Sequence, residues 1–325
     1  MLLREGRYFI VGGAGFLGSH FTDALLSDSG TRRVTLFDNF SSGREWHYEA
    51  HQADARLHIV RADAGDTGAL TATMAGHDWV IHLAANPDIA RAEQDPEIDF
   101  YRGTLLTNNV LEAMRRTGVS RMLYASGSGV YGDGGSRVLS EDYSPMVPIS
   151  PYGASKLASE ALIASYCAMF GLQARVLRFG NIVGARQTHG VGFDFVRSLH
   201  VKPKRLRILG NGEQSKPYIH ASDVVQAALC ATKYPSPAFS VFNVATDDVL
   251  TVTEIAELAV EAVGLAATPA FDYAGGPRGW RGDVPVVRLD CSRIHALGWF
   301  PKWNSREAMR QSLQALIADE RTLRT

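Results

Sequence analysis

The sequence predicts an α/β fold with a doubly wound parallel sheet and a smaller, loop-rich α/β lobe. Two patterns in the 325 residues indicate it. Short apolar runs alternate with helical stretches through the first half of the chain, and the first run ends in a glycine-rich turn that opens a helix. Alternation of this kind is typical of parallel strands joined by crossover helices.

The first element is a strand over residues 7–11, which the glycine turn joins to a helix over residues 19–26. Gly12 allows a tight turn, Gly15 lets the backbone approach a pyrophosphate, and Gly18 lets the helix pack closely on the strand. The start of the helix adds amide donors for an anion. These features predict a Rossmann dinucleotide cradle lined by Gly12, Gly15, Phe16, Leu17 and Gly18.

The second strand, residues 33–38, ends in Asp38, twenty residues beyond Gly18. A carboxylate at this position can accept hydrogen bonds from both hydroxyls of an adenosine ribose, and it would repel a 2′-phosphate. Asp38 therefore favours NAD, while Arg44 nearby leaves NADP open. The turn that follows adds Asn39, Ser42 and Gly43 to the expected cofactor site.

Further apolar runs predict strands at residues 57–61, 79–83, 121–125 and 174–179. The carboxyl ends of parallel strands meet at one edge of the sheet, where ligands bind in folds of this class. The residues that follow these strand ends are Asp63, Ala84, Ser126 and Asn181. We expect them to share one crevice.

The pattern becomes irregular from about residue 180, where loops are punctuated by helices at 221–232 and 252–263. We therefore expect an NAD-binding domain over residues 1–180. A substrate domain should cover residues 181–325, with some segments packing back on the first domain.

Composition indicates a soluble protein with small-molecule partners. The 33 basic and 34 acidic residues give no electrostatic footprint for nucleic acid or for a membrane surface. No apolar stretch approaches the roughly 20 residues that span a bilayer, and residues 1–6 lack a signal-peptide core, so we expect a cytoplasmic protein. Cys167, Cys230 and Cys291 are few and far apart, which indicates packed thiols rather than a disulfide framework or a metal site.

Tyr152 and Lys156 lie four residues apart in a stretch that predicts an amphipathic helix. Residues with this spacing share one helix face. A nearby ammonium favours phenolate over phenol and lowers the pKa of a tyrosine from its usual value of about 10. We expect Tyr152 to be a base that takes a proton from a hydroxyl group.

Over essentially its full length the chain resembles the extended short-chain dehydrogenases/reductases of the nucleotide-sugar epimerase and dehydratase group. Six motifs carry the resemblance because they occur in the family order. They are Gly-Gly-Ala-Gly-Phe-Leu-Gly at 12–18, His-Leu-Ala-Ala at 82–85, Val-Tyr-Gly at 130–132, Tyr152 with Lys156, Asn181, and Tyr-Ile-His at 218–220. The resemblance implies a homodimer formed through paired helices.

The resemblance also implies roles for individual residues. Asp63 should meet the adenine, and Lys156 should also bond the nicotinamide ribose. The expected cofactor site is completed by Ala64, Leu83, Ala84, Ala85, Tyr152 and Phe179. The expected substrate site comprises Ser128, Tyr152, Asn181, Phe193, Ile208, Lys216, Tyr218, Arg278 and Arg281, and either arginine could hold the diphosphate.

The reaction subclass depends on the residues before Val-Tyr-Gly. A 4,6-dehydratase of this group has an Asp-Glu pair where this chain has Ser128 and Gly129. The acid/base residues expected of a decarboxylase or a 3,5-epimerase are also missing from the sequence. Gly127 stands where many relatives carry the catalytic Ser or Thr, so that role falls to Ser126 or Ser128, with Ser126 preferred.

The chain thus resembles UDP-glucose and UDP-hexuronate 4-epimerases most. By that resemblance, tightly bound NAD would oxidise the sugar transiently at carbon 4, the 4-keto sugar would rotate, and the hydride would return to the opposite face. The sugar, and the choice among UDP, GDP and ADP, stay open. So do a 4-ketoreductase, a dehydratase and a non-enzymatic NAD sensor.

Overall fold

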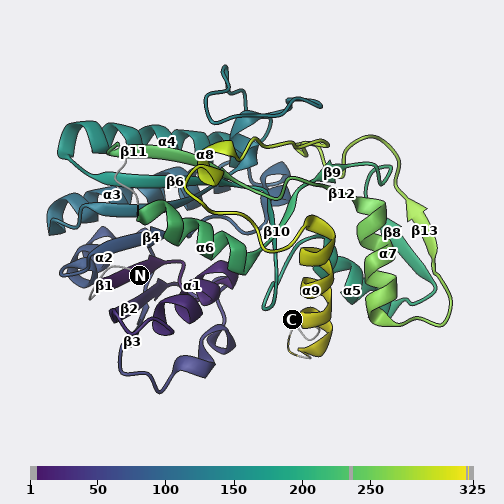
Figure 1. Cartoon of the computed structure of the whole chain (residues 1–325), viewed down its shortest axis with the longest axis horizontal. Coiled ribbons are helices and arrows are strands. Elements are labelled where there is room, and N and C mark those ends of the chain that lie inside the picture. Colours follow the sequence, from purple (N-terminus) through teal and green to yellow (C-terminus); the bar gives the residue numbers. More distant parts are fainter. Residues whose placement is uncertain (1–5, 234–236, 320, 322–325) are drawn as a thin grey trace. The chain divides into compact units, whose positions relative to one another are not determined.

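The computed structural model describes residues 6–233, 237–319 and 321 (Figure 1). Residues 1–5, on which the expected absence of a signal peptide largely rests, lie outside the described residues. The chain divides into two compact units, which we describe separately. The first unit comprises residues 1–130, 151–178 and 225–242, and the second comprises residues 131–150, 179–224 and 243–325.

A seven-stranded parallel sheet forms the centre of the first unit and confirms the expected fold class. Its strand order is β11-β6-β5-β4-β1-β2-β3. The strands are β1 (Gly6–Val11), β2 (Thr31–Asp38), β3 (Leu57–Arg61), β4 (Trp79–His82), β5 (Arg121–Gly127), β6 (Gln173–Phe179) and β11 (Phe239–Val244). The sequence predicted six of them and missed β11, which pairs with β6 although it follows the expected domain boundary by some sixty residues.

Helices α2 (Thr67–Met74), α3 (Leu105–Thr117) and α4 (Pro151–Phe170) form one layer, in which α2 packs on α3 and α3 on α4. In Figure 1, α1 (Phe16–Leu26) and α6 (Ala221–Thr232) cross in front of the strands. Helix α1 begins three residues before the sequence predicted. Both faces of the sheet are covered, which explains why its central strands are apolar runs rather than alternating patterns.

The core of the first unit lies between the sheet and the α2–α4 layer. Phe9, Val80 and Met122 come from three neighbouring strands, and Val110 and Ile163 face them from α3 and α4; all five are fully buried. Close packing of this kind fixes α4 against the strands. It therefore determines where the side chains of α4 meet the end of β5.

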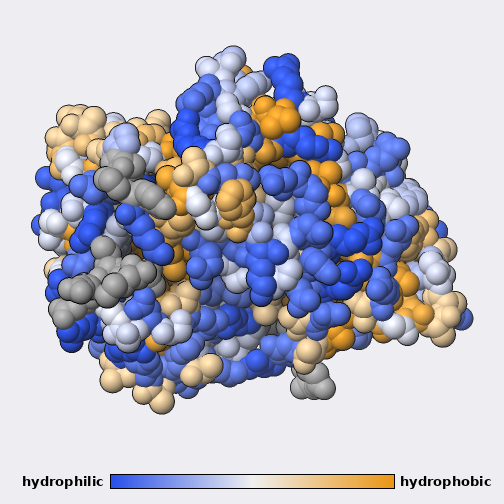
Figure 2. Space-filling model, viewed as in Figure 1, coloured by the Kyte–Doolittle hydropathy of each residue, from blue (hydrophilic) through white to orange (hydrophobic). Residues whose placement is uncertain are grey.

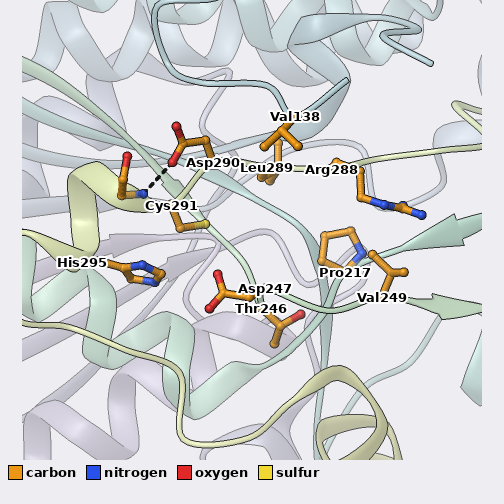
Figure 3. Close-up of a pocket in the computed structure, with 11 residues that line it drawn as sticks. Val138, Pro217, Thr246, Asp247, Val249, Arg288, Leu289, Asp290, Cys291 and His295 are labelled. Carbon is orange, nitrogen blue, oxygen red and sulfur yellow. Dashed lines mark hydrogen bonds between the residues drawn. The ribbon is translucent and has the colours of Figure 1, made fainter. Parts of the chain in front are cut away.

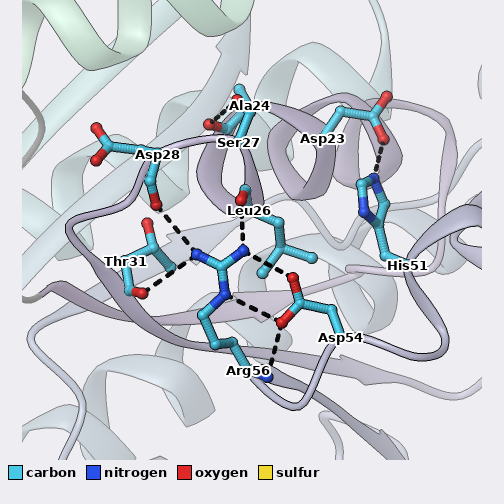
Figure 4. Close-up of polar contacts among 9 residues, drawn as sticks. All are labelled: Asp23, Ala24, Leu26, Ser27, Asp28, Thr31, His51, Asp54 and Arg56. Atoms are coloured by element: carbon cyan, nitrogen blue, oxygen red, sulfur yellow. Dashed lines mark hydrogen bonds and ion pairs between the residues drawn. The ribbon is translucent and has the colours of Figure 1, made fainter.

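One arginine joins the far end of α1 to the start of β3 (Figure 4). The last turn of α1 contains no basic residue. The Arg56 guanidinium donates to the carbonyl oxygen of Leu26 at 2.6 Å and to that of Asp28 at 3.1 Å, and it pairs with Asp54 at 2.7 Å. A cation at the C-terminal end of a helix interacts favourably with the helix dipole, and its donors satisfy carbonyl oxygens that have no partner within the helix.

The second unit has its own core and three two-stranded pairs. Its strands are β7 (Asn181–Val183), β8 (Arg205–Ile208), β9 (Ser215–Lys216), β10 (Tyr218–His220), β12 (Leu250–Thr251) and β13 (Ala270–Tyr273). Its other helices are α5 (Val191–Val201), α7 (Val252–Val263), α8 (Ser292–His295) and α9 (Ser305–Ala318). Helices α5, α7 and α9 pack on one another. The bounds of α6 and α7 are those that the sequence predicted.

The surface is hydrophilic over most of the face shown in Figure 2, and apolar residues lie in small separate groups there. No helix in the described part of the chain is long and apolar enough to cross a bilayer. Cys167, Cys230 and Cys291 are free thiols; Cys167 and Cys291 are buried, as expected, and Cys230 is half-buried. The cytoplasmic location stays a prediction.

Candidate active site

The glycine turn lies between β1 and α1, as the sequence predicted. Gly12 has a positive φ of 80°, and a Cβ atom there would lie 2.8 Å from the backbone nitrogen of Ala84. A side chain on Gly18 would press against the carbonyl oxygen of Gly13. Gly15 is the N-cap of α1, and no side chain caps that end. The first amides of the helix are therefore available to an anion.

Asp38 ends β2 beside this turn and is 8% exposed. Its carboxylate accepts hydrogen bonds from the amides of Ala14 at 2.9 Å and Phe40 at 2.7 Å. Burial raises the pKa of Asp38, while those two amides and the charge of Arg61 lower it. The carboxylate thus fixes the turn, and each of its oxygens keeps a second lone pair that can accept a hydroxyl.

The loop after β2 closes over the same turn. The amide of Arg44 donates to the carbonyl oxygen of Ala14 at 3.0 Å, and a Cβ atom on Gly43 would lie 2.9 Å from the Asp38 carboxylate. Ser42 is half-buried in this loop. The arrangement leaves Gly43 as a position where a larger residue would displace either Asp38 or Ala14.

The turn after β3 carries Asp63 and Ala64. The Asp63 carboxylate accepts from the side chain of Asn39 at 2.7 Å and from Arg102 at 3.1 Å, and Asn39 foremost holds its pKa below the usual range. The carbonyl oxygen of Ala64 accepts from Asn109 at 3.1 Å. Two expected cofactor residues, Asn39 and Asp63, are therefore in direct contact.

The fourth strand end, after β4, continues the same edge. The amides of Leu83 and Ala84 both donate to the carbonyl oxygen of Val11, at 2.9 and 3.0 Å. Leu83, Ala84 and Ala85 are each half-buried. The structure thus brings together the ends of β1, β2, β3 and β4 with the glycine turn, as a dinucleotide cradle requires. Phe179, another expected cofactor residue, ends β6 and is buried.

Tyr152 and Lys156 occupy the first two turns of α4. The Lys156 ammonium is buried and lies 5.6 Å from the centre of the Tyr152 ring and 5.0 Å from that of Tyr124. Among the described residues its one hydrogen bond goes to the carbonyl oxygen of Ala125, at 2.7 Å. An ammonium has three donors, so two remain for a ligand.

The expected direction of the Tyr152 pKa is wrong for the protein without ligands. Burial raises the pKa of Tyr152 to about 12, and the charge of Asp99 raises it as well. Burial also lowers the pKa of Lys156 to about 8, against the carboxylates of Glu160 and Asp99, which raise it. Helix spacing alone indicates the nearby cation but does not indicate burial, which dominates here.

Ser126, the serine preferred from the sequence, is 4% exposed and donates to the Glu160 carboxylate at 2.5 Å. Arg178 on β6 binds the same carboxylate at 2.7 Å through a second, bidentate contact. Both members of this ion pair are buried. The Ser126 hydroxyl therefore satisfies a buried charge, and its proton is already committed to Glu160.

Ser128 is half-buried and begins the short helix η5 (Ser128–Tyr131). A Cβ atom on Gly127 would meet nothing within 4 Å. No other group therefore fills the space of the Ser or Thr side chain that many relatives carry at this position. A Cβ atom on Gly129 would lie 3.5 Å from the backbone of Gly153 in the first turn of α4. Of the two candidate serines, Ser128 is the one whose hydroxyl makes no hydrogen bond to another described residue.

Two expected phosphate-binding cations of the second unit are engaged with carboxylates. The Lys216 ammonium lies 2.5 Å from Asp283, whose carboxylate also accepts from the amide of Gly279 at 3.0 Å. Arg278 pairs with Asp133 at 2.7 Å. Lys216 therefore anchors the 278–283 loop, on which Arg281 is exposed.

The other expected substrate residues lie at strand ends or helix starts of the second unit. Asn181 and Tyr218 are register partners in the parallel pair β7–β10, and Tyr218 is buried. Phe193 lies in the first turn of α5 and is 3% exposed. Ile208 is fully buried in the core, so only its backbone can face a ligand.

The second unit also contains a pocket of about 310 Å³ (Figure 3). The described residues that line it include none of the expected site residues; they are Val138, Pro217, Thr246, Asp247, Val249, Arg288, Leu289, Asp290, Cys291, Ser292 and His295. Burial raises the pKa of Cys291 to about 12, so its thiol is not a nucleophile at neutral pH. We assign no catalytic role to this pocket.

Sequence reasoning missed Glu160, Arg178 and Asp99. The spacing of Lys156 and Glu160, four residues apart on α4, was a signal for the first, since such residues share a helix face. Arg178 was hidden in an apolar run, where a charge indicates a buried partner. Asp99 lies in an irregular segment, and nothing in its sequence neighbourhood indicates that it is buried.

Comparisons with known proteins agree with this geometry. Residues 8–245 match the model of the NAD dependent epimerase/dehydratase family. The UDP-glucose 4-epimerase of Mycolicibacterium smegmatis is 31% identical over 95% of this chain and 97% of its own. The structure of the Thermus thermophilus UDP-glucose 4-epimerase in complex with NAD is 30% identical, with a TM-score of 0.84 over 96% of this chain and 99% of that one.

A dTDP-glucose 4,6-dehydratase from Streptomyces venezuelae has a TM-score of 0.89 over 97% of this chain and 98% of its own, at 24% identity. That likeness shows the fold alone. Because an epimerase and a dehydratase share this fold, with TM-scores of 0.84 and 0.89, the backbone does not distinguish the reactions. The side chains before Val130 must do so.

Replacing Asp38 with asparagine should weaken NAD binding by about tenfold or more, because a charged acceptor of hydroxyl groups becomes a neutral one. Isothermal titration of the cofactor-free protein with NAD measures the change. Glu45→Gln is the matched control, since it removes an exposed carboxylate from the same loop and should leave the affinity unchanged. Equal Kd values for Asp38→Asn and the unaltered protein would contradict the assignment.

Proposed function

Because the chain belongs to the NAD dependent epimerase/dehydratase family, we propose that it is an NAD-dependent nucleotide-sugar 4-epimerase. One observation carries the proposal: α4 places a tyrosine and a buried lysine together at the end of β5, and no acid/base pair accompanies them at Ser128 and Gly129. The similarity to UDP-glucose 4-epimerases over nearly the whole chain supports the same reaction.

The described residues fit NAD. The first amides of α1 have no capping side chain, Asp38 can accept hydroxyls, and Lys156 has two unspent donors. When bound, NAD supplies reversible oxidation at carbon 4 of the sugar and a positive charge that favours the phenolate of Tyr152. We propose that the cradle at the strand ends binds NAD tightly, because Asp38 and the Gly12 turn fix its backbone.

Tyr152 removes the proton of the sugar 4-hydroxyl and returns it after the sugar has turned over. A positioned base contributes about 10²–10⁴-fold to such a reaction. The Lys156 ammonium, held by the Ala125 carbonyl, stabilises the phenolate as it forms. Ser128 donates a hydrogen bond to the same sugar oxygen, since Ser126 is committed to Glu160.

We propose a UDP-sugar as the substrate, because the similar proteins that share about 30% of the sequence are named for UDP-glucose. In the second unit, the 278–283 loop is the element that suits the diphosphate. Lys216 and Asp283 fix that loop, and its two arginines, Arg278 and Arg281, each carry the planar fork that suits phosphate. Arg278 also pairs with Asp133.

We propose that the enzyme is a homodimer that pairs through α4. The outward side of this helix carries small side chains at helical spacing, and Met169 follows them with 73% exposure. The exposed small residues are Ala154, Ala158, Ala161, Ser165 and Ala168. Small residues let two helices approach closely, and a two-fold axis would place the same side of both helices in contact.

The central test is to incubate the protein, without added cofactor, with UDP-, GDP- and ADP-sugars in deuterated water and to follow the products by NMR. We expect the carbon-4 epimer of one sugar, with no deuterium at any carbon. Tyr152→Phe should lower kcat by about 10²–10⁴-fold and keep NAD bound. Deuterium at carbon 3 or 5 would mean enolisation, and normal turnover of Tyr152→Phe would exclude the base proposed here.

Replacing each serine with alanine in turn distinguishes the roles of Ser126 and Ser128. Ser128→Ala should lower kcat by about 10²-fold without changing Tm, because it removes a donor to the reacting oxygen. Ser126→Ala should lower Tm and leave most of kcat, because it removes a donor from a buried carboxylate. The reverse result, with activity lost only in Ser126→Ala, would return the catalytic role to Ser126.

The proposed dimer predicts that Ala158→Arg yields a monomer, since a long charged side chain would separate the two helices. Size-exclusion chromatography with light scattering measures the mass. Ala72→Arg places the same side chain on an exposed position of α2 and should leave the dimer intact. A dimer that survives Ala158→Arg would move the interface elsewhere.

A further inference from the structure

Asp99 is a buried carboxylate next to the catalytic helix that the mechanism above does not use. The residue is 2% exposed and immediately precedes a single π-helical turn, η4 (Phe100–Thr104). Its Oδ1 accepts from the side chain of Asn86 at 3.0 Å. Its Oδ2 is buried and has no hydrogen-bond partner among the described residues. An unsatisfied carboxylate oxygen in the interior is costly, and such sites call for an explanation.

The backbone around Asp99 is tied directly to α4. The Ser155 hydroxyl donates to the carbonyl oxygen of Asp99 at 2.7 Å, and the Thr104 hydroxyl donates to the hydroxyl oxygen of Ser155 at 3.0 Å. Gly103 packs so closely on Ser155 that a side chain there would overlap it. Because Ser155 directly precedes Lys156, the segment that carries Asp99 is fixed against the catalytic turn.

The charges around Lys156 show what balances Asp99. Glu160, the other carboxylate near the ammonium, already has Arg178 as a bidentate partner. Asp99 has no arginine or lysine within 4 Å among the described residues. Lys156 is also beyond that distance, but it is the cation whose charge lowers the pKa of Asp99, which burial raises. The group consists of the half-buried phenol of Tyr152, the buried ammonium of Lys156 and the buried carboxylate of Asp99.

We propose that Asp99 is the counter-ion of Lys156 and a positioning residue of the reaction, whose charge decides at which pH the Tyr152 phenol and the Lys156 ammonium lose their protons. The inference rests on the proposed function, because it assigns the control of that same base. Asp99 transfers no proton to the sugar; it acts through Tyr152 and Lys156.

The direction of the effect follows from the charges. A carboxylate disfavours a nearby phenolate and favours a nearby ammonium. In agreement, the charge of Asp99 is second to burial in raising the pKa of Tyr152, and it raises the pKa of Lys156 against burial. Removing the charge should therefore lower both pKa values, so the acid and alkaline limbs of the pH profile should move in the same direction.

Other titratable groups face this cluster from the elements packed on it. Glu160 faces Lys156 from α4. Burial raises the pKa of Asp99, and the charge of Asp95, four residues earlier, raises it further. Burial lowers the pKa of His82 on β4 to about 3 and raises that of Tyr124 on β5. His82 and Tyr124 are thus neutral near pH 7. Asp99 is the group whose charge acts on both Tyr152 and Lys156.

The test is the pH dependence of kcat/KM for epimerisation by the NAD-bound enzyme and by Asp99→Asn. We expect both limbs of the profile to move to lower pH by about one unit in the variant. Asp95→Asn, which removes a carboxylate from the same segment, should leave the limbs in place. Asp99→Glu keeps the charge and should stay close to the unaltered profile. Limbs that do not move in Asp99→Asn, even with lowered activity, would reduce Asp99 to a structural role and overturn the proposal.

A second readout does not need turnover. Ultraviolet absorbance of tyrosinate is titrated in the NAD-bound protein, and subtraction of the Tyr152→Phe titration isolates Tyr152. Asp99→Asn should deprotonate Tyr152 at a pH about one unit lower. Asp99→Ser serves as the neutral variant if the asparagine does not fold. If no sugar is epimerised but this shift is observed, the proposed function fails and the role of Asp99 stands; an unchanged titration overturns the role of Asp99 alone.

Discussion

Lys156 carries its ammonium into the interior of the first unit, where only 4% of the residue is exposed. Removal of an ammonium from water is costly, and one carbonyl hydrogen bond does not offset it. Two features compensate within the described chain: the Ala125 carbonyl at 2.7 Å and the carboxylates of Glu160 and Asp99. The packing of α4 on the sheet keeps all of them in place.

Because burial of the ammonium is costly, the polar groups around it are hydrogen-bonded or ion-paired with one another. The Glu160 carboxylate binds Arg178 and Ser126, so part of its charge is already offset by groups other than Lys156. The Ser126 hydroxyl proton is then engaged with Glu160, which is why we propose Ser128 as the donor to the sugar.

The cofactor edge depends on a simpler constraint. Four parallel strands end beside one glycine turn, and the Asp38 carboxylate joins that turn to the end of β2 through the amide of Ala14. The same atoms that fix the backbone can also accept the hydroxyls of a ribose. Structural and ligand-binding roles are therefore combined in one residue, and its substitution is expected to affect both.

The sequence predicted most of the fold because glycine spacing and apolar runs are local signals. The bounds of β3, α6 and α7 agree with expectation, and the cradle residues lie together at one edge. Strand β11 was missed because its place beside β6 is a long-range pairing that no local pattern indicates. The pKa direction of Tyr152 was wrong for a similar reason, since burial depends on the whole fold. Asp99 was missed because its importance comes from the elements that enclose it.

The most direct test of the account is a stopped-flow measurement of reduced nicotinamide absorbance when the NAD-bound protein is mixed with its nucleotide sugar. We expect a transient signal that decays while the carbon-4 epimer forms, with no net reduction at equilibrium and no transient in Tyr152→Phe. Lasting accumulation of reduced cofactor would show a dehydrogenase. Epimer formed without any transient in a protein stripped of NAD would contradict the central claim.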